Sequence, residues 1–199
     1  KTLLGRSLLG LLPSAATSAA ENLSLDGEDL SNAPQSRWRK VRGSKVGLIF
    51  QEPMVSLNPS LTIGAQLAEA MKLHTRLSLS QIREMACELL AKVHVPDPAT
   101  ALRRFPHQFS GGLRQRIMLA SVLLPKPKLL IADEPTTALD VIVQKQVLDV
   151  MVTLTRELGT TVLLITHDLG LVAKYANRMA VMRHGEILEC GNVDAILAE

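Results

Sequence analysis

The residues best suited to chemistry are two adjacent carboxylates, Asp133 and Glu134, which follow the apolar run 129–132. Such a run is typical of a buried parallel strand, and ligands bind at the carboxyl ends of these strands. There an aspartate can hold hydrated Mg²⁺, and the adjacent glutamate can orient and deprotonate a water for attack on phosphorus. A strand that simply ends in an acidic turn would have the same sequence, so the pair alone leaves both interpretations open.

A second candidate is Ser110-Gly111-Gly112, placed where a helix is expected to begin. The two glycines leave backbone N–H groups unshielded, and the helix dipole adds partial positive charge, so the segment suits a phosphate. A flexible helix N-cap could also have this sequence. The segment precedes the carboxylate pair by one short helix, and this combination favours the phosphate-binding interpretation.

Three short apolar runs predict the strands that would position these residues. We expect buried strands at 45–50, 129–132 and 161–166, and a hairpin with strands at 179–182 and 186–189 that turns at His184-Gly185. Helical periodicity separates the runs. Strands that alternate with helices predict an α/β fold with a parallel sheet covered on both faces and a helical block inserted near residues 60–125.

Capping residues and prolines indicate where the helices begin and end. A capping box of Ser78 and Gln81 opens a helix within the periodic region 63–95. Other helices are expected over 2–12, from just after Gly112 to Pro125, and over 143–158. Residues 14–44 are expected to form a connector with a turn at Asp26-Gly27 and one short strand. The basic run 37–42 within it is expected to be solvated, as part of the connector or as the face of a helix, and contact with anionic lipid is the less favoured alternative.

Composition excludes several classes of protein. The chain has 199 residues, of which 47% are hydrophobic and 21% charged, so it can bury a core and is too apolar for disorder. Aromatic residues make up only 3%, which argues against a base-stacking surface, and the net charge of +3 is weak support for nucleic acid binding. The distant Cys87 and Cys190 predict reduced thiols, and no apolar run is long enough to span a membrane.

Five segments, in their types and in their order along the chain, resemble the motifs of ATP-binding cassette (ABC) nucleotide-binding domains. They are the signature motif at 110–115, the Walker B strand at 130–134, the D-loop at 137–140, the switch histidine His167 and the Q-loop glutamine Gln51. The resemblance covers residues 45–190. It implies a P-loop NTPase (RecA-like) fold in a single domain, 1–199, with a catalytic core at 1–59 and 126–199 and a helical subdomain at 60–125.

The resemblance implies catalytic roles for Glu134, His167 and Gln51 and a role in Mg²⁺ binding for Asp133. Glu134 would be the general base or the water-orienting carboxylate, and Asp133 an outer-shell ligand of Mg²⁺. Gln51 would touch both the metal and the attacking water through its amide group. His167 would donate a hydrogen bond to the γ-phosphate, although in isolation it would be interpreted as a core histidine.

The resemblance also implies an ATP site shared between two subunits. Ser110, Gly111, Gly112 and Gln115 of one subunit would close over ATP held by the other, and Asp140 would contact the opposite subunit. The opening residues Lys1 and Thr2 match the end of the phosphate-binding loop GxxxxGK[ST]. Lys1 would then hold the β- and γ-phosphates, and Thr2 would bind the Mg²⁺.

This sequence lacks the glycines of that loop, the strand before them and the aromatic residue that stacks on adenine. We therefore expect it to be truncated at the N-terminus within the Walker A motif, and the 199 residues alone to be poorly stable and to bind ATP weakly.

Arg42-Gly43 and residues 49–54 and 56–59 resemble the subgroup that energises bacterial uptake of dipeptides, oligopeptides, nickel and similar solutes. This implies a second ABC ATPase subunit, identical or a sister, together with transmembrane permease subunits and, indirectly, a solute-binding protein. No nucleic acid partner is implied. The expected location is peripheral, on the cytoplasmic face of the bacterial inner membrane.

Two alternatives belong to other functional classes. A soluble ABC-type ATPase of DNA repair or translation is disfavoured where it carries coiled-coil arms, because the segment between Gln51 and Ser110 is short and contains Pro96, Pro98 and Pro106. A regulatory cassette that binds ATP without turnover is the other alternative. Nothing in the sequence supports it, because Glu134 and His167 are both present.

Overall fold

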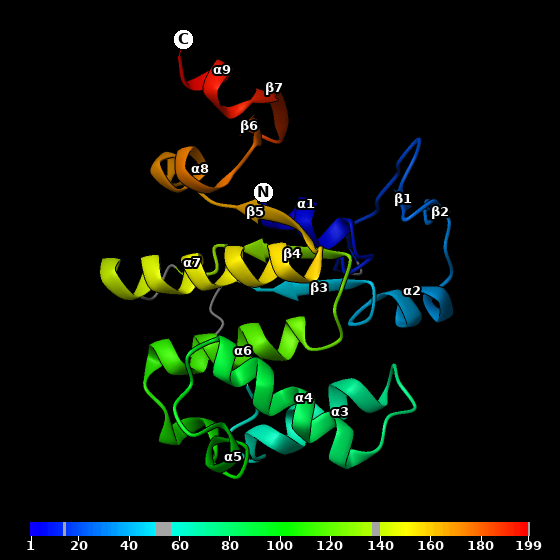
Figure 1. Ribbon diagram of the computed structural model, residues 1–199. Coiled ribbons are helices and arrows are strands. Elements are labelled where there is room, and N and C mark those ends of the chain that lie inside the picture. The colour runs from blue at the N-terminus through cyan, green and yellow to red at the C-terminus, as the bar shows by residue number, and fades with distance from the viewer. Residues whose placement is uncertain (14, 51–56, 137–139, 199) are drawn as a thin grey trace.

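The computed structural model describes residues 1–13, 15–50, 57–136 and 140–198 (Figure 1). At its centre is a three-stranded parallel sheet in the order β3-β4-β5, formed by Val46–Ile49, Leu129–Asp133 and Thr161–Ile165. Leu130 pairs with Gly47 on one side and with Val162 on the other. All three predicted strands are confirmed, and the carboxyl ends of β4 and β5 meet at one edge of the sheet.

Apolar clusters cover both faces of this sheet, as the strand pattern predicted. Because successive side chains of a strand point to opposite faces, Leu130 and Ala132 belong to one cluster, whereas Leu129 and Ile131 belong to the other. The larger cluster contains residues of α6 (Gly111–Leu123) and α7 (Val141–Leu158). The smaller contains Trp38 of α2 (Gln35–Val41) and residues that follow α1 (Thr2–Ser7).

The block between β3 and β4 is helical in its described residues and lies beneath the sheet in Figure 1. It consists of α3 (Ile63–Lys72), α4 (Leu79–Lys92), α5 (Pro98–Ala101), the 3₁₀ helix η2 (Pro106–Gln108) and α6. The predicted capping box opens α4, where the Ser78 N–H donates to Gln81 Oε1 at 2.9 Å. Between Pro59 and Ser110 no helix is longer than the 14 residues of α4, which leaves no coiled-coil arm there.

Helix α7 begins at Val141, two residues earlier than expected, because the Asp140 side chain caps it. Asp140 Oδ1 accepts hydrogen bonds from the N–H groups of Ile142 at 3.1 Å and Val143 at 3.0 Å. The helix ends, as expected, at Gly159, which has a φ of +65°. Beyond β5 the chain forms α8 (Leu169–Tyr175), the predicted hairpin of β6 (Arg178–Arg183) and β7 (Glu186–Asn192), and α9 (Val193–Leu197).

Two expectations for the first 44 residues are wrong. Helix α1 ends at Ser7 instead of residue 12, because Gly10, with a φ of +60°, closes it. The N–H of Gly10 donates to Ser7 and that of Leu11 to Arg6, which is the hydrogen-bond pattern of a glycine-terminated helix.

The connector is also more ordered than expected. The turn at Asp26-Gly27 joins two strands, β1 (Ser24–Leu25) and β2 (Glu28–Asp29), and the basic run forms helix α2. Trp38 and Val41, three residues apart on α2, are only 5% and 1% exposed. The run is therefore amphipathic: Trp38 and Val41 cover one face of the sheet, while Arg39 and Lys40 are exposed, as expected for a solvated helix face. In the described part of the chain, no helix combines the length and apolar character needed to cross a membrane.

Candidate functional site

Glu134 and His167, which follow the neighbouring strands β4 and β5, contact each other. Glu134 Oε1 lies 2.9 Å from His167 Nδ1. The Glu134 side chain is 23% exposed and that of His167 is 73% exposed, so the pair borders solvent. The Glu134 N–H donates to the Ile165 carbonyl at 2.9 Å, and this bond fixes the residue beside the end of β5.

The backbone of Glu134 has a φ of +46°. This left-handed conformation is uncommon for a residue with a side chain, and the surrounding structure must hold it in place. Strained residues of this kind cluster at functional sites, which is consistent with the role predicted for Glu134.

Asp133, the last residue of β4, is buried, with 4% of its surface exposed. Its Oδ1 atom is buried and, among the described residues, has no hydrogen-bond partner. A carboxylate oxygen in this state needs a donor, and a water of a hydrated cation supplies one. No group of three or more His, Cys, Asp or Glu residues that could hold a metal occurs in the described chain. A cation here would therefore need further oxygens, such as those of a phosphate, which suits Mg²⁺.

Lys1 lies at the same edge of the sheet. Its Nζ donates to the Thr166 carbonyl at 3.0 Å, next to His167. Thr2, the first residue of α1, is partly exposed beside it. Gly5 allows α1 to pack this closely, because a Cβ atom at that position would lie 2.9 Å from the Ile165 side chain.

The predicted signature residues form a second group, where α6 packs against the start of α7. Ser110 caps α6 by accepting a hydrogen bond from the Leu113 N–H at 3.4 Å. A Cβ on Gly112 would lie 2.7 Å from Val143 Cγ1, so the glycine allows the two helices to approach closely. Asp140 caps α7 at the same place.

Gln115 does not face solvent in this structure. It is 2% exposed, and both atoms of its amide group are buried without a hydrogen-bond partner among the described residues. Its predicted contact with ATP stays a prediction. Gln51 and the D-loop residues 137–139 lie outside the described residues.

A polar cluster that the sequence analysis did not find connects α8, the helix after His167, to α7. Tyr175 Oη donates to Asp149 Oδ1 at 2.6 Å, and Lys174 Nζ lies 3.2 Å from the same oxygen. The hydrogen bonds from Tyr175 and Lys174 lower the pKa of Asp149. Asp168 caps α8 by accepting from the Gly170 N–H at 2.8 Å. Because 26 residues separate Tyr175 from Asp149, no local sequence pattern signals this contact.

Comparisons with known proteins agree with this geometry. The family model described as "ABC transporter" matches residues 1–137. The dipeptide transport ATP-binding protein DppD of Escherichia coli is 43% identical over 98% of this chain and 60% of its own length. The oligopeptide transport ATP-binding protein OppD of Bacillus subtilis is 47% identical over 86% of this chain and 48% of its own length. The chain thus spans about half the length of these curated relatives.

Solved structures show the same fold. The structure of cbiO1 from Clostridium perfringens, part of the ABC transporter complex cbiONQ, matches with a TM-score of 0.80 and 26% identity, over 98% of this chain and 74% of that one. The bacterial ABC transporter cassette MJ0796, solved as a dimer, matches with a TM-score of 0.73 and 27% identity, over 86% of this chain and 73% of that one. Site geometry, family model and fold agree, and the chain belongs to the ABC transporter family.

Proposed function

We propose that this chain is the ATP-hydrolysing part of a bacterial ABC importer for peptides or similar small solutes. The observation that carries the proposal is the contact between Glu134 and His167 beside Lys1, at the carboxyl ends of β4 and β5. The names of DppD and OppD support the class of solute, because they describe dipeptide and oligopeptide transport.

Each side chain has a role that its chemistry can fulfil. Lys1 holds the terminal phosphates of ATP, while Thr2, Gln51 and, through water, Asp133 hold Mg²⁺. When bound, the metal offsets the negative charge on the phosphate oxygens. Glu134 orients the attacking water and accepts its proton. Catalysis then depends on positioning and on electrostatic stabilisation of the transferred phosphoryl group.

The contact with Glu134 restricts where His167 can carry its protons. An ionised carboxylate only accepts hydrogen bonds, so Nδ1 must carry a proton when it bonds to Glu134. The remaining nitrogen, Nε2, can then donate to a γ-phosphate only in the imidazolium form. His167 therefore has two ways to donate to the γ-phosphate: as an imidazolium that stays bonded to Glu134, or as a neutral ring that leaves Glu134 when ATP binds.

A second subunit completes the site in this proposal. Ser110, Gly111 and Gly112 of one subunit, together with Gln115, cover the ATP that is held at Lys1 of the other. Val141 and Ile142, directly after Asp140, are 80% and 72% exposed. Adjacent large apolar residues at the surface are typical of an interaction site, and here they lie beside the predicted D-loop. MJ0796, solved as a dimer, supports such an arrangement.

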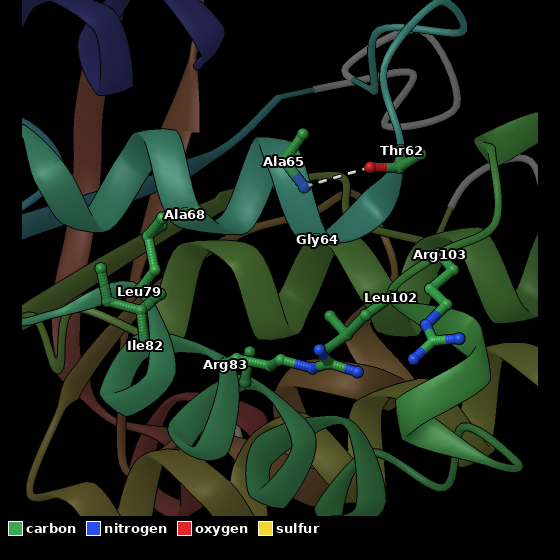
Figure 2. A pocket seen from close by; sticks show the side chains of 10 residues that line it. Thr62, Gly64, Ala65, Ala68, Leu79, Ile82, Arg83, Leu102 and Arg103 are labelled. Carbon is green, nitrogen blue, oxygen red and sulfur yellow. Dashed lines mark hydrogen bonds between the residues drawn. The ribbon is translucent and has the colours of Figure 1, made fainter.

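The helical block offers a surface for the permease subunits. A groove of about 380 Å³ runs between α3 and α4 and has a mainly apolar lining (Figure 2). Figure 2 shows the side chains of Arg83 and Arg103 toward the Leu102 end of this groove. The lining residues are Thr62, Gly64, Ala65, Ala68, Leu79, Ile82, Arg83, Ala86, Leu102 and Arg103. Docking there would hold the chain at the cytoplasmic face of the bacterial inner membrane as a peripheral subunit.

The decisive experiment replaces the proposed base. In the full-length protein, Glu134→Gln keeps the size of the side chain and removes its ability to accept a proton, so we expect ATP hydrolysis to fall by about 10²-fold or more. Binding of Mg·ATP should persist, which a fluorescent nucleotide can measure. Glu186→Gln, on the exposed strand β7, is the matched control. Hydrolysis by Glu134→Gln within about tenfold of the parent would show that Glu134 is not the base.

A further inference from the structure

Arg42, the last residue of the basic run, binds the end of α1. Its Nε donates to the Leu9 carbonyl and its Nη2 to the Gly10 carbonyl, both at 2.8 Å. The guanidinium also lies 5.5 Å from the centre of the Trp38 ring, and Nη1 contacts Gln35 Oε1 at 3.3 Å. Partial burial lowers the pKa of Arg42. Arg42 is therefore held by α2 on one side and by two carbonyls of a distant segment on the other.

Those two carbonyls belong to the turn that closes α1. Leu9 and Gly10 follow the helix, and a guanidinium can donate to both of their carbonyls at once through its fixed, planar set of N–H groups. Gly10 fits the contact tightly. A Cβ there would lie 3.1 Å from Arg42 Nη2 and 3.2 Å from the Trp38 ring, and the φ of +60° would strain any other residue.

The other end of α1 carries Lys1 and Thr2. The helix has only six residues, a length of about 9 Å at 1.5 Å per residue, so the turn at Leu9 and Gly10 lies close to the residues predicted to bind phosphate. Its middle rests on the sheet through Gly5, which packs against Ile165. The Arg42 contact and the Gly5 contact thus act together with the buried Leu9 to hold α1, and Lys1 meets Thr166 at its other end.

We propose that Arg42 is a positioning residue for nucleotide binding, which fixes the closing turn of α1 against Trp38 and so holds Lys1 and Thr2 where they bind the phosphates. The inference rests on the proposed function, because it assigns phosphate binding to Lys1. It gives a physical role to Arg42, one of the residues on which the resemblance to the importer subgroup rests. Loss of Arg42 should weaken the binding of ATP and leave Glu134 and His167 in place.

The test compares Arg42→Gln with Arg39→Gln in the full-length protein. Both variants lose one positive charge from α2, but Arg39 is exposed and lies three residues from Arg42. We expect Arg42→Gln to raise KM for ATP about tenfold with kcat within about twofold of the parent, because a displacement of about 1 Å at a binding group has effects of this size or larger. Arg39→Gln should leave both constants unchanged. Hydrogen exchange of the amides of residues 2–9 should be faster only in Arg42→Gln.

The result that overturns the proposal is an equal KM in the two variants. A fall in kcat at unchanged KM would overturn it as well, because general loss of folded protein has that effect. Should Arg42→Gln not fold, Arg42→Lys provides the test: it keeps the charge but cannot span both carbonyls, and an unchanged KM would contradict the proposal.

Lys1→Ala separates this inference from the proposed function. If Lys1→Ala binds ATP normally, the phosphate site itself is wrong; if it loses ATP while Arg42→Gln behaves as the parent, only the role of Arg42 is wrong.

Discussion

At the scale of single residues, some buried polar atoms of the predicted ATP-binding residues have no hydrogen-bond partner in the described part of the chain. Buried polar atoms are normally paired, and an unpaired one destabilises a protein by about 1–3 kcal/mol. Within the described residues, Asp133 Oδ1 and both amide atoms of Gln115 are buried without a partner. Asp133 is a proposed ligand of hydrated Mg²⁺, and Gln115 is a proposed contact of ATP. Their state is consistent with partners that arrive with the nucleotide or with a second subunit.

Glu28 shows the opposite case, a carboxylate whose partners are all present. It pairs with Arg37 and with Lys45, whose Nζ lies 3.0 Å from Glu28 Oε2. The hydrogen bonds from Arg37 and Lys45 lower the pKa of Glu28 from 4.5 to about 2. The group connects β2 to α2 and to the residue before β3. It therefore secures the segment that holds Arg42.

This pairing predicts a pH dependence of stability. Because the folded-state pKa of Glu28 is lowered, its contribution is complete above pH 4.5 and is lost as the pH falls toward 2. We expect Glu28→Gln to be less stable than the parent at pH 7, with the difference shrinking between pH 4.5 and 2. Urea unfolding across this range measures it. Glu21→Gln, an exposed residue just before β1, is the control, and a difference for Glu28→Gln that does not change with pH would refute the assignment.

At the scale of elements, the contact between α6 and β3 fixes the signature helix on the sheet. Gly47 of β3 lies so close to α6 that an added Cβ would be 2.4 Å from Val122 Cγ1. Valine is stiff about its first side-chain bond, so it cannot swing aside. The glycine therefore serves close packing between a strand and a helix, and its φ is unremarkable. Any larger residue must push α6 away from the sheet.

We accordingly expect Gly47→Ala to destabilise the protein by about 1–3 kcal/mol, the usual effect of overpacking a core. Val122→Ala removes the obstructing methyl groups, so the double variant should recover part of the loss. Thermal or urea unfolding of the four proteins of this cycle measures the coupling between the two sites. Additive effects of the two substitutions would show that the clash does not determine the packing here.

Local signals predicted most of these elements, and long-range contacts account for the rest. The capping box at Ser78 and the glycine at 159 act within one turn, so the sequence alone identifies them. The end of α1 was also signalled by a glycine, Gly10, but the leucines beyond it continued the helical spacing. Trp38 and Val41, three residues apart, indicated an amphipathic helix that the surrounding basic residues obscured. The contacts of Arg42 with Leu9 and of Glu134 with His167 join distant segments, which no local pattern reveals.

At the scale of the whole molecule, the predicted ATP-binding residues fall into two groups. Lys1, Glu134 and His167 gather where β4 and β5 end. Ser110 to Gly112 lie where α6 meets the start of α7, beside Asp140 and the exposed Val141. In the proposed head-to-tail pair, each ATP takes one group from each subunit. A lesion in the first group and a lesion in the second group then fall in the same ATP site when different subunits carry them, and in different ATP sites when one subunit carries both.

Consider pairs that join a Lys1→Ala subunit to a Ser110→Arg subunit. One site then carries both lesions and the other carries none, so we expect measurable hydrolysis although pairs of either variant alone have almost none. The matched control joins the double variant to the parent. It has the same two lesions, but each site carries one of them, so its activity should stay near that of the inactive pairs. Each mixed pair is isolated through two different affinity tags and assayed for phosphate release. The order of activities reverses if the two groups act within one chain: the control pair then contains an intact parent chain and hydrolyses ATP, whereas each chain of the Lys1→Ala and Ser110→Arg pair carries a lesion. A control pair more active than the pair of single variants would therefore refute the shared site.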